Sequence, residues 1–150
     1  MKERINLGKS SPEMYEKVAE LDQLVSAGLD KAGFSEGFCH LLKLRVSQIN
    51  GCAFCMKMHS SDAVKAEESL DRLAVLSSWK ETQYFTNAER VALSLIEAIT
   101  NISGDQIPDD VYKAASSELT DVQISSVQWA GILMNSWNRI AIASRYPVRG

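Results

Sequence analysis

Apolar residues recur at the spacing of an α-helix along almost the whole chain, and no stretch alternates as a β-strand would. The three prolines, Pro12, Pro108 and Pro147, stand where a helix would begin or stop. With 150 residues, of which 45% are hydrophobic, the chain has the size of one domain with its own core. We therefore expect a single all-α domain over residues 1–150, built from six to seven helices.

Capping residues mark where several of these helices begin and end. Ser11-Pro12 and Ser35 are typical helix starts, and Asn50-Gly51 is typical of a stop. Thr86 and Thr120 each begin a capping box, in which the side chains of the first and fourth residues satisfy free backbone donors. The expected helices cover roughly residues 12–28, 35–50, 51–68, 70–76, 87–102, 108–115 and 121–142.

The last of these helices is apolar around most of its circumference. A helix of this kind must be buried on nearly all sides. Either it is the central helix of a monomer, or another subunit covers one of its surfaces, and the pattern leaves both interpretations open. Trp129 and Trp137 in this helix, like Trp79 earlier in the chain, are expected to be core aromatics.

Charge and hydropathy exclude several classes of protein. Sixteen basic and nineteen acidic residues give a net charge of −3, and no basic patch suggests nucleic-acid binding. The N-terminus lacks the apolar stretch of a signal peptide, and the longest apolar run, residues 130–134, is far below the ~20 residues of a membrane span. We expect a cytoplasmic protein with no nucleic-acid or membrane partner, whose three cysteines are too few for a disulfide scaffold.

The segment that carries chemistry is Cys52-Ala-Phe-Cys55-Met-Lys-Met-His59. On a helix, offsets of three and four residues place both thiols and the imidazole on one face. Because Asn50-Gly51 precedes them, the cysteines fall near a helix start, where free backbone N–H groups favour thiolate over thiol. His59 can accept the Cys55 proton or stabilise the thiolate as imidazolium. Such a unit suits attack on a peroxide followed by disulfide formation.

Other interpretations of the same residues stay open at this point. Cys39, Cys52, Cys55 and His59 would supply the ligands of a zinc site, although no second C-x-x-C is present. The cysteines could also be buried structural residues, or a redox sensor that forms its disulfide without catalytic turnover. His40 could approach the cysteine pair if the two helices form an antiparallel hairpin, or it could be a partly exposed surface residue.

The run from residue 41 to residue 55, followed by His59, closely resembles the core motif of the alkylhydroperoxidase D-like proteins, which belong to the carboxymuconolactone decarboxylase superfamily. The match extends to Trp79, to residues 85–93 and to residues 136–141, so it covers roughly residues 11–145. The decarboxylase branch of this superfamily lacks the cysteine pair, so the resemblance argues against lactone decarboxylation.

The resemblance implies an all-helical homo-oligomer, a trimer or a hexamer, with peroxidase activity and no haem, flavin or metal. Cys55 matches the attacking thiolate, Cys52 the resolving cysteine and His59 a member of the proton relay. The expected partners are a hydroperoxide substrate and a thiol or dithiol reductant, such as a lipoyl protein, thioredoxin or a small thiol. One position departs from the motif, since His40 stands where the family has its relay glutamate, and a histidine there could also pass protons.

Overall fold

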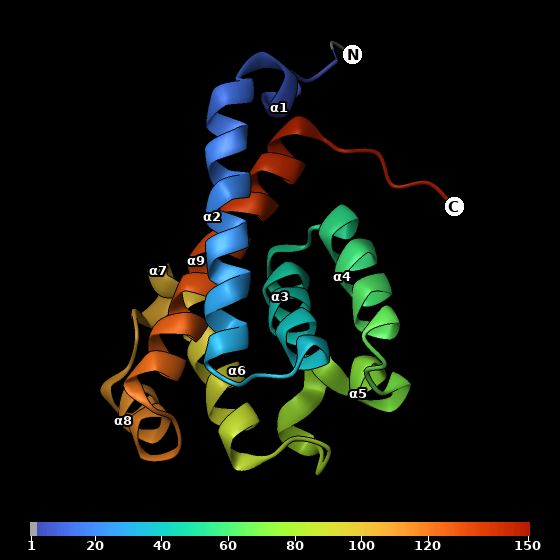
Figure 1. Ribbon diagram of the computed structural model, residues 1–150. Helices are drawn as coiled ribbons and strands as arrows, with labels where there is room; N and C mark the ends of the chain where they lie inside the picture. Colours follow the sequence, from blue (N-terminus) through green and yellow to red (C-terminus); the bar gives the residue numbers. More distant parts are fainter. Residues whose placement is uncertain (1–2) are drawn as a thin grey trace.

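The computed structural model describes residues 3–150, and these residues form helices without any strand (Figure 1). The all-α prediction is therefore confirmed. Nine α-helices and one 3-10 helix follow one another in the described residues: α1 (Leu7–Ser10), α2 (Pro12–Lys31), α3 (Glu36–Asn50), α4 (Ala53–Lys65), α5 (Leu70–Val75), η1 (Leu76–Glu81), α6 (Asn87–Thr100), α7 (Ile102–Asp105), α8 (Asp109–Glu118) and α9 (Asp121–Ser144).

The expected number of six to seven helices was too low. The two additional α-helices, α1 and α7, contain four residues each, and so short a turn has no apolar periodicity to detect. The 3-10 helix η1 continues directly from α5, where a single helix was expected. Helix α2 runs past Gly28 to Lys31, and the chain leaves it at Gly33, whose φ of +85° suits glycine.

Both capping boxes form as the sequence predicts, whereas Ser11 precedes α2 without a capping hydrogen bond from its side chain. The Thr86 hydroxyl accepts a hydrogen bond from the Glu89 backbone at 3.2 Å, and the Glu89 carboxylate accepts one from the Thr86 backbone at 2.9 Å. Thr120 and Gln123 form the same reciprocal pair at the start of α9. Each box satisfies backbone donors that would otherwise be free, which fixes where α6 and α9 begin.

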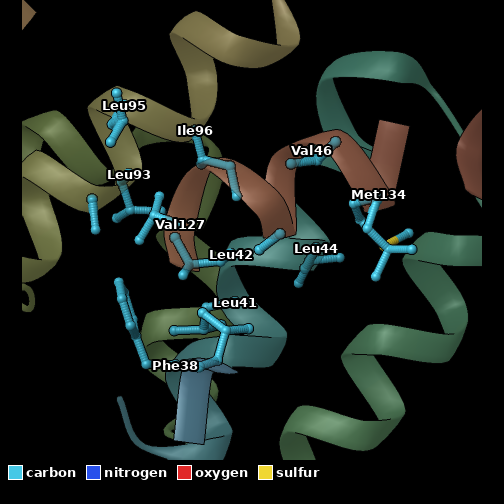
Figure 2. Packing of buried hydrophobic residues seen from close by; sticks show 14 of the residues in the cluster. Phe38, Leu41, Leu42, Leu44, Val46, Leu93, Leu95, Ile96, Val127 and Met134 are labelled. Atoms are coloured by element: carbon cyan, nitrogen blue, oxygen red, sulfur yellow. The ribbon is translucent and has the colours of Figure 1, made fainter. Parts of the chain in front are cut away.

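Helix α3 is the centre of the core and packs against α4, α6 and α9. In Figure 1 it lies between α2 and α4, and α9 crosses behind α2. Figure 2 shows how side chains of three helices meet in this core: Phe38, Leu41, Leu42, Leu44 and Val46 from α3, Leu93, Leu95 and Ile96 from α6, and Val127 and Met134 from α9. All of them are at most 2% exposed, and each buried side chain of this size contributes roughly 1.5–3 kcal/mol.

The last helix is only partly covered by the rest of the chain. Trp79 is buried and Trp137 is half-buried, but Trp129 is 49% exposed, so the expectation of a core position was wrong for Trp129. Ile132 and Ile142, on the same helix, are also more than 40% exposed. Among residues 3–150, no helix combines the length and the apolar character that crossing a membrane requires.

Candidate functional site

The turn between α3 and α4 positions the two cysteines. Gly51 ends α3 in the left-handed conformation, with φ of +69°, which explains why glycine occupies this turn. Cys52 then serves as the N-cap of α4, and its sulfur accepts a hydrogen bond from the Cys55 backbone at 3.4 Å. The two sulfur atoms form a disulfide, with Cα atoms 5.3 Å apart, and both residues are at least 98% buried.

His59 lies one helical turn after Cys55 and is only 6% exposed. Neither of its ring nitrogens has a hydrogen-bond partner among the described residues. Burial, together with the positive charge of Lys43 and the neighbouring His40, lowers the pKa of His59 to about 3. In the disulfide form the imidazole is therefore neutral. A thiolate beside it in the reduced form would favour the imidazolium, so both roles considered from the sequence remain compatible with its position.

The structure brings His40 to His59. The antiparallel packing of α3 and α4 places the two rings with their centroids 5.8 Å apart. His40 is half-buried, its Nδ1 has no hydrogen-bond partner among the described residues, and burial is the main cause that lowers its pKa. The hairpin arrangement that would let His40 approach the cysteine helix is thus present.

Asp62 is a site residue that sequence reasoning missed. One of its carboxylate oxygens, one ring nitrogen of His40 and one of His59 lie within 4.8 Å of one another. It follows His59 by three residues on α4, so it shares a helix face with that imidazole. An acidic residue at this spacing is common on exposed helix faces. The sequence offers one signal for Asp62, namely its position three residues after His59 on a helix that packs against the helix of His40.

Lys43 was also missed, because lysine is seldom buried and gives no motif. It is 7% exposed, and its ammonium group donates to the Ser26 hydroxyl at 3.2 Å. Asp22 lies 3.6 Å from the same ammonium group and also accepts a hydrogen bond from the Trp137 indole at 3.2 Å. Two residues of α2, Ser26 and Asp22, therefore position the Lys43 ammonium group next to the histidines, and Trp137 of α9 in turn positions Asp22.

Two different cavities reach the two cysteines. Cys55 and His59 line a mostly apolar cavity of about 270 Å³, whose other walls include Met58, Met134 and Trp137. Cys52 lines an adjoining cavity of about 300 Å³, which shares Phe54 and Tyr146 with the first. A cavity with room for a small, largely apolar molecule therefore adjoins Cys55 and His59.

Cys39 does not join the pair. Burial is the main cause that raises the pKa of its thiol to about 11, so it stays protonated at neutral pH. Among residues 3–150, the cluster of His40, His59 and Asp62 does not include Cys39. The structure thus gives no support to the zinc site of three cysteines and one histidine that the spacing allowed.

Polar side chains hold the cysteine turn against α9. Asn50, the last residue of α3, donates to Asn135 at 2.9 Å and to Asn138 at 3.0 Å. Asn138 in turn donates to the Ser47 hydroxyl at 3.1 Å and is fully buried. Because these bonds join the end of α3 to the middle of α9, they fix the position from which α4 begins.

The sequence model of the family described as "Carboxymuconolactone decarboxylase family" matches residues 12–98, which is more than half of the chain. The chain belongs to this family. The family expected from the motif around Cys52 and Cys55 is therefore confirmed.

Relatives and a solved structure extend the similarity beyond this range. The uncharacterized protein YdfG of Bacillus subtilis is 33% identical over 143 residues, which is 95% of each chain. The uncharacterized protein YnjA of Escherichia coli is 31% identical over 58 residues, covering 39% of this chain and 32% of its own length. A crystal structure from Agrobacterium tumefaciens shares the fold with a TM-score of 0.89 and 36% identity, covering 99% of this chain and all of that one. That protein is described as one of unknown function and as a suggested antioxidant defence protein AhpD.

Proposed function

We propose that the protein is a cofactor-free thiol peroxidase that reduces hydroperoxides through a cycle of Cys52 and Cys55. The observation that carries this proposal is the bonded pair of sulfur atoms at the start of α4, with the neutral His59 one turn away. The family and the fold shared with a suggested antioxidant protein support it. We also propose a cytoplasmic homo-oligomer, a trimer or a hexamer, that requires no haem, flavin or metal for this cycle.

The cycle begins with the reduced dithiol. His59 takes the proton of Cys55, and the thiolate attacks the terminal oxygen of the hydroperoxide. The O–O bond breaks, Cys55 becomes a sulfenic acid, and the alcohol leaves with a proton returned from the relay. Two electrons pass from sulfur to oxygen in this step. The apolar wall formed by Met58 and Met134 would accommodate the organic part of the substrate.

The second step closes the disulfide that the structure contains. The thiol of Cys52 attacks the sulfenic sulfur of Cys55, and water leaves as the S–S bond forms. A thiol or dithiol reductant then opens this bond by exchange through a mixed disulfide and is itself oxidised to a disulfide. The two cysteines are three residues apart on one turn, so no change of fold is needed to bring the sulfurs together.

Steady-state turnover of cumene hydroperoxide with excess dihydrolipoamide tests the proposal. Cys55→Ser should abolish turnover because the attacking thiolate is gone, while Cys52→Ser should consume one equivalent of peroxide and then accumulate Cys55 in higher oxidation states. Cys39→Ser, which removes the third thiol, is the matched control and should retain turnover. Full activity of Cys55→Ser would overturn the assignment, and a single oxidation without cycling in the unsubstituted protein would point to a redox sensor.

A further inference from the structure

Three side chains around His59 form a group that the peroxidase cycle does not fully explain. His40 on α3 and His59 and Asp62 on α4 place their ligand atoms within 4.8 Å of one another. No other group of three or more histidine, cysteine or acidic side chains among residues 3–150 is this close. Two imidazoles and one carboxylate are a ligand set of zinc sites that keep a fourth position open.

Three of the four imidazole nitrogens are buried without a hydrogen-bond partner among residues 3–150. His59 is 94% buried, and its two nitrogens, like Nδ1 of His40, make no hydrogen bond within the described part of the chain. A buried polar atom left unpaired costs about 1–3 kcal/mol. A ligand that binds to these nitrogens removes part of that cost, so the cluster favours occupation by an ion that imidazole coordinates.

To bind zinc, the three ligand atoms must move closer together than the 4.8 Å within which they lie. Tetrahedral zinc, with bonds of ~2.0–2.1 Å, separates its ligand atoms by roughly 3.3 Å. The half-buried Asp62 would approach the imidazoles by rotating its carboxylate away from Lys65, which it contacts at 3.4 Å, and rotation of the half-buried His40 ring would shorten the distance between the two imidazoles. Asp62 also lines an open cavity of about 600 Å³ at the surface, so this ligand is accessible from solvent.

The charge of Lys43 opposes a cation at this place, since it acts on both histidines. Asp22 lies 3.6 Å from that ammonium group and offsets its charge, and the Asp62 carboxylate adds a negative charge directly at the cluster. Lys65, 3.4 Å from Asp62, also opposes a cation, so a divalent ion must displace this surface ion pair when it binds.

We propose that His40, His59 and Asp62 form a binding site for one divalent transition-metal ion, with Zn²⁺ as its representative. The site differs from a cysteine zinc site, because it is complete while Cys52 and Cys55 are joined in the disulfide. A metal on His59 would occupy a nitrogen that the proposed peroxidase cycle uses, so zinc should slow that cycle. This consequence rests on the proposed function, whereas metal binding itself does not.

Calorimetric titration of Zn²⁺ into the tag-free, oxidised protein tests the site, because the disulfide removes both paired thiols as ligands. We expect one Zn²⁺ per chain and binding at least about tenfold weaker in His40→Ala and in Asp62→Asn. The matched controls are Asp71→Asn, an exposed acid on α5, and Cys39→Ser, the remaining thiol, and both should bind zinc unchanged.

Three results would overturn the metal site: no saturable binding at micromolar zinc, an affinity in both ligand variants equal to that of the unsubstituted protein, or loss of binding in Cys39→Ser. If His40→Ala does not fold, as judged by circular dichroism, Asp62→Asn decides the question alone. Peroxidase activity is not measured in this titration, so an inactive protein that binds zinc would refute the proposed function and leave the metal site standing.

Discussion

At the residue scale, His40 is the position where the site departs from the family motif. It stands where the resembling family has a glutamate, and the structure places its ring 5.8 Å from that of His59. A ring nitrogen of each imidazole lies within 4.8 Å of the carboxylate of Asp62, which is half-buried at the surface. A histidine can pass a proton between its two nitrogens, so it can serve the relay without the carboxylate.

We expect His40→Ala to lower the second-order rate of Cys55 oxidation by peroxide about tenfold or more, since proton transfer by a positioned group contributes at least that much. Stopped-flow tryptophan fluorescence of the reduced protein, with a chelator present to exclude metal, measures this rate. Circular dichroism serves to verify that the fold is kept. A rate unchanged from that of the unsubstituted protein would remove His40 from the site.

Glycines show at the element scale how much room the packed helices leave for a side chain. Gly131 lies on the buried face of α9, and a β-carbon there would stand 2.8 Å from Cγ2 of Ile99 on α6. Gly28 lies inside α2, where a β-carbon would meet only the Ser126 hydroxyl at 3.8 Å. The same change therefore has opposite effects at the two positions.

We expect Gly131→Ala to lower the free energy of unfolding by about 1–3 kcal/mol, because α6 and α9 must move apart. The matched variant Gly28→Ala should raise it by up to about 1 kcal/mol, since alanine favours the helix and has room. Urea denaturation at equal protein concentration measures both. Equal stability of the two variants would show that α6 and α9 do not pack this closely.

The sequence predicts a feature well when it depends on residues a few positions apart, and poorly when it depends on packing between helices. The helix starts at Ser35, Thr86 and Thr120 follow from local hydrogen bonds, so they were predictable. Helices α1 and α7 were not predictable, because they are single turns without periodicity. Asp62 and Lys43 joined the site through packing between α2, α3 and α4, which one-dimensional spacing does not reveal.

At the scale of the whole molecule, the exposed apolar side chains of α9 bear on whether several chains associate. Trp129 and Ile132 lie one turn apart on this helix and are 49% and 44% exposed. Large apolar side chains at adjacent turns are costly to leave in water. Of the two interpretations of the apolar last helix, these exposed residues favour the one in which another copy covers it.

We expect light scattering to give a particle several times the 16.6 kDa of one chain at micromolar concentration. Trp129→Asp should shift the particle toward 16.6 kDa, because a buried charge would replace an apolar contact. Val148→Asp, at a comparably exposed apolar residue in the C-terminal segment, is the control and should leave the particle mass unchanged. A monomeric unsubstituted protein would contradict the homo-oligomer.

The measurement that most directly tests the central claim counts thiols in the reduced, metal-free protein before and after one equivalent of cumene hydroperoxide. Intact mass and peptide mapping of the product accompany the thiol count. The proposed chemistry predicts rapid loss of two of the three thiols, a Cys52–Cys55 disulfide and no added oxygen. Three thiols that remain unreactive toward the peroxide would contradict it.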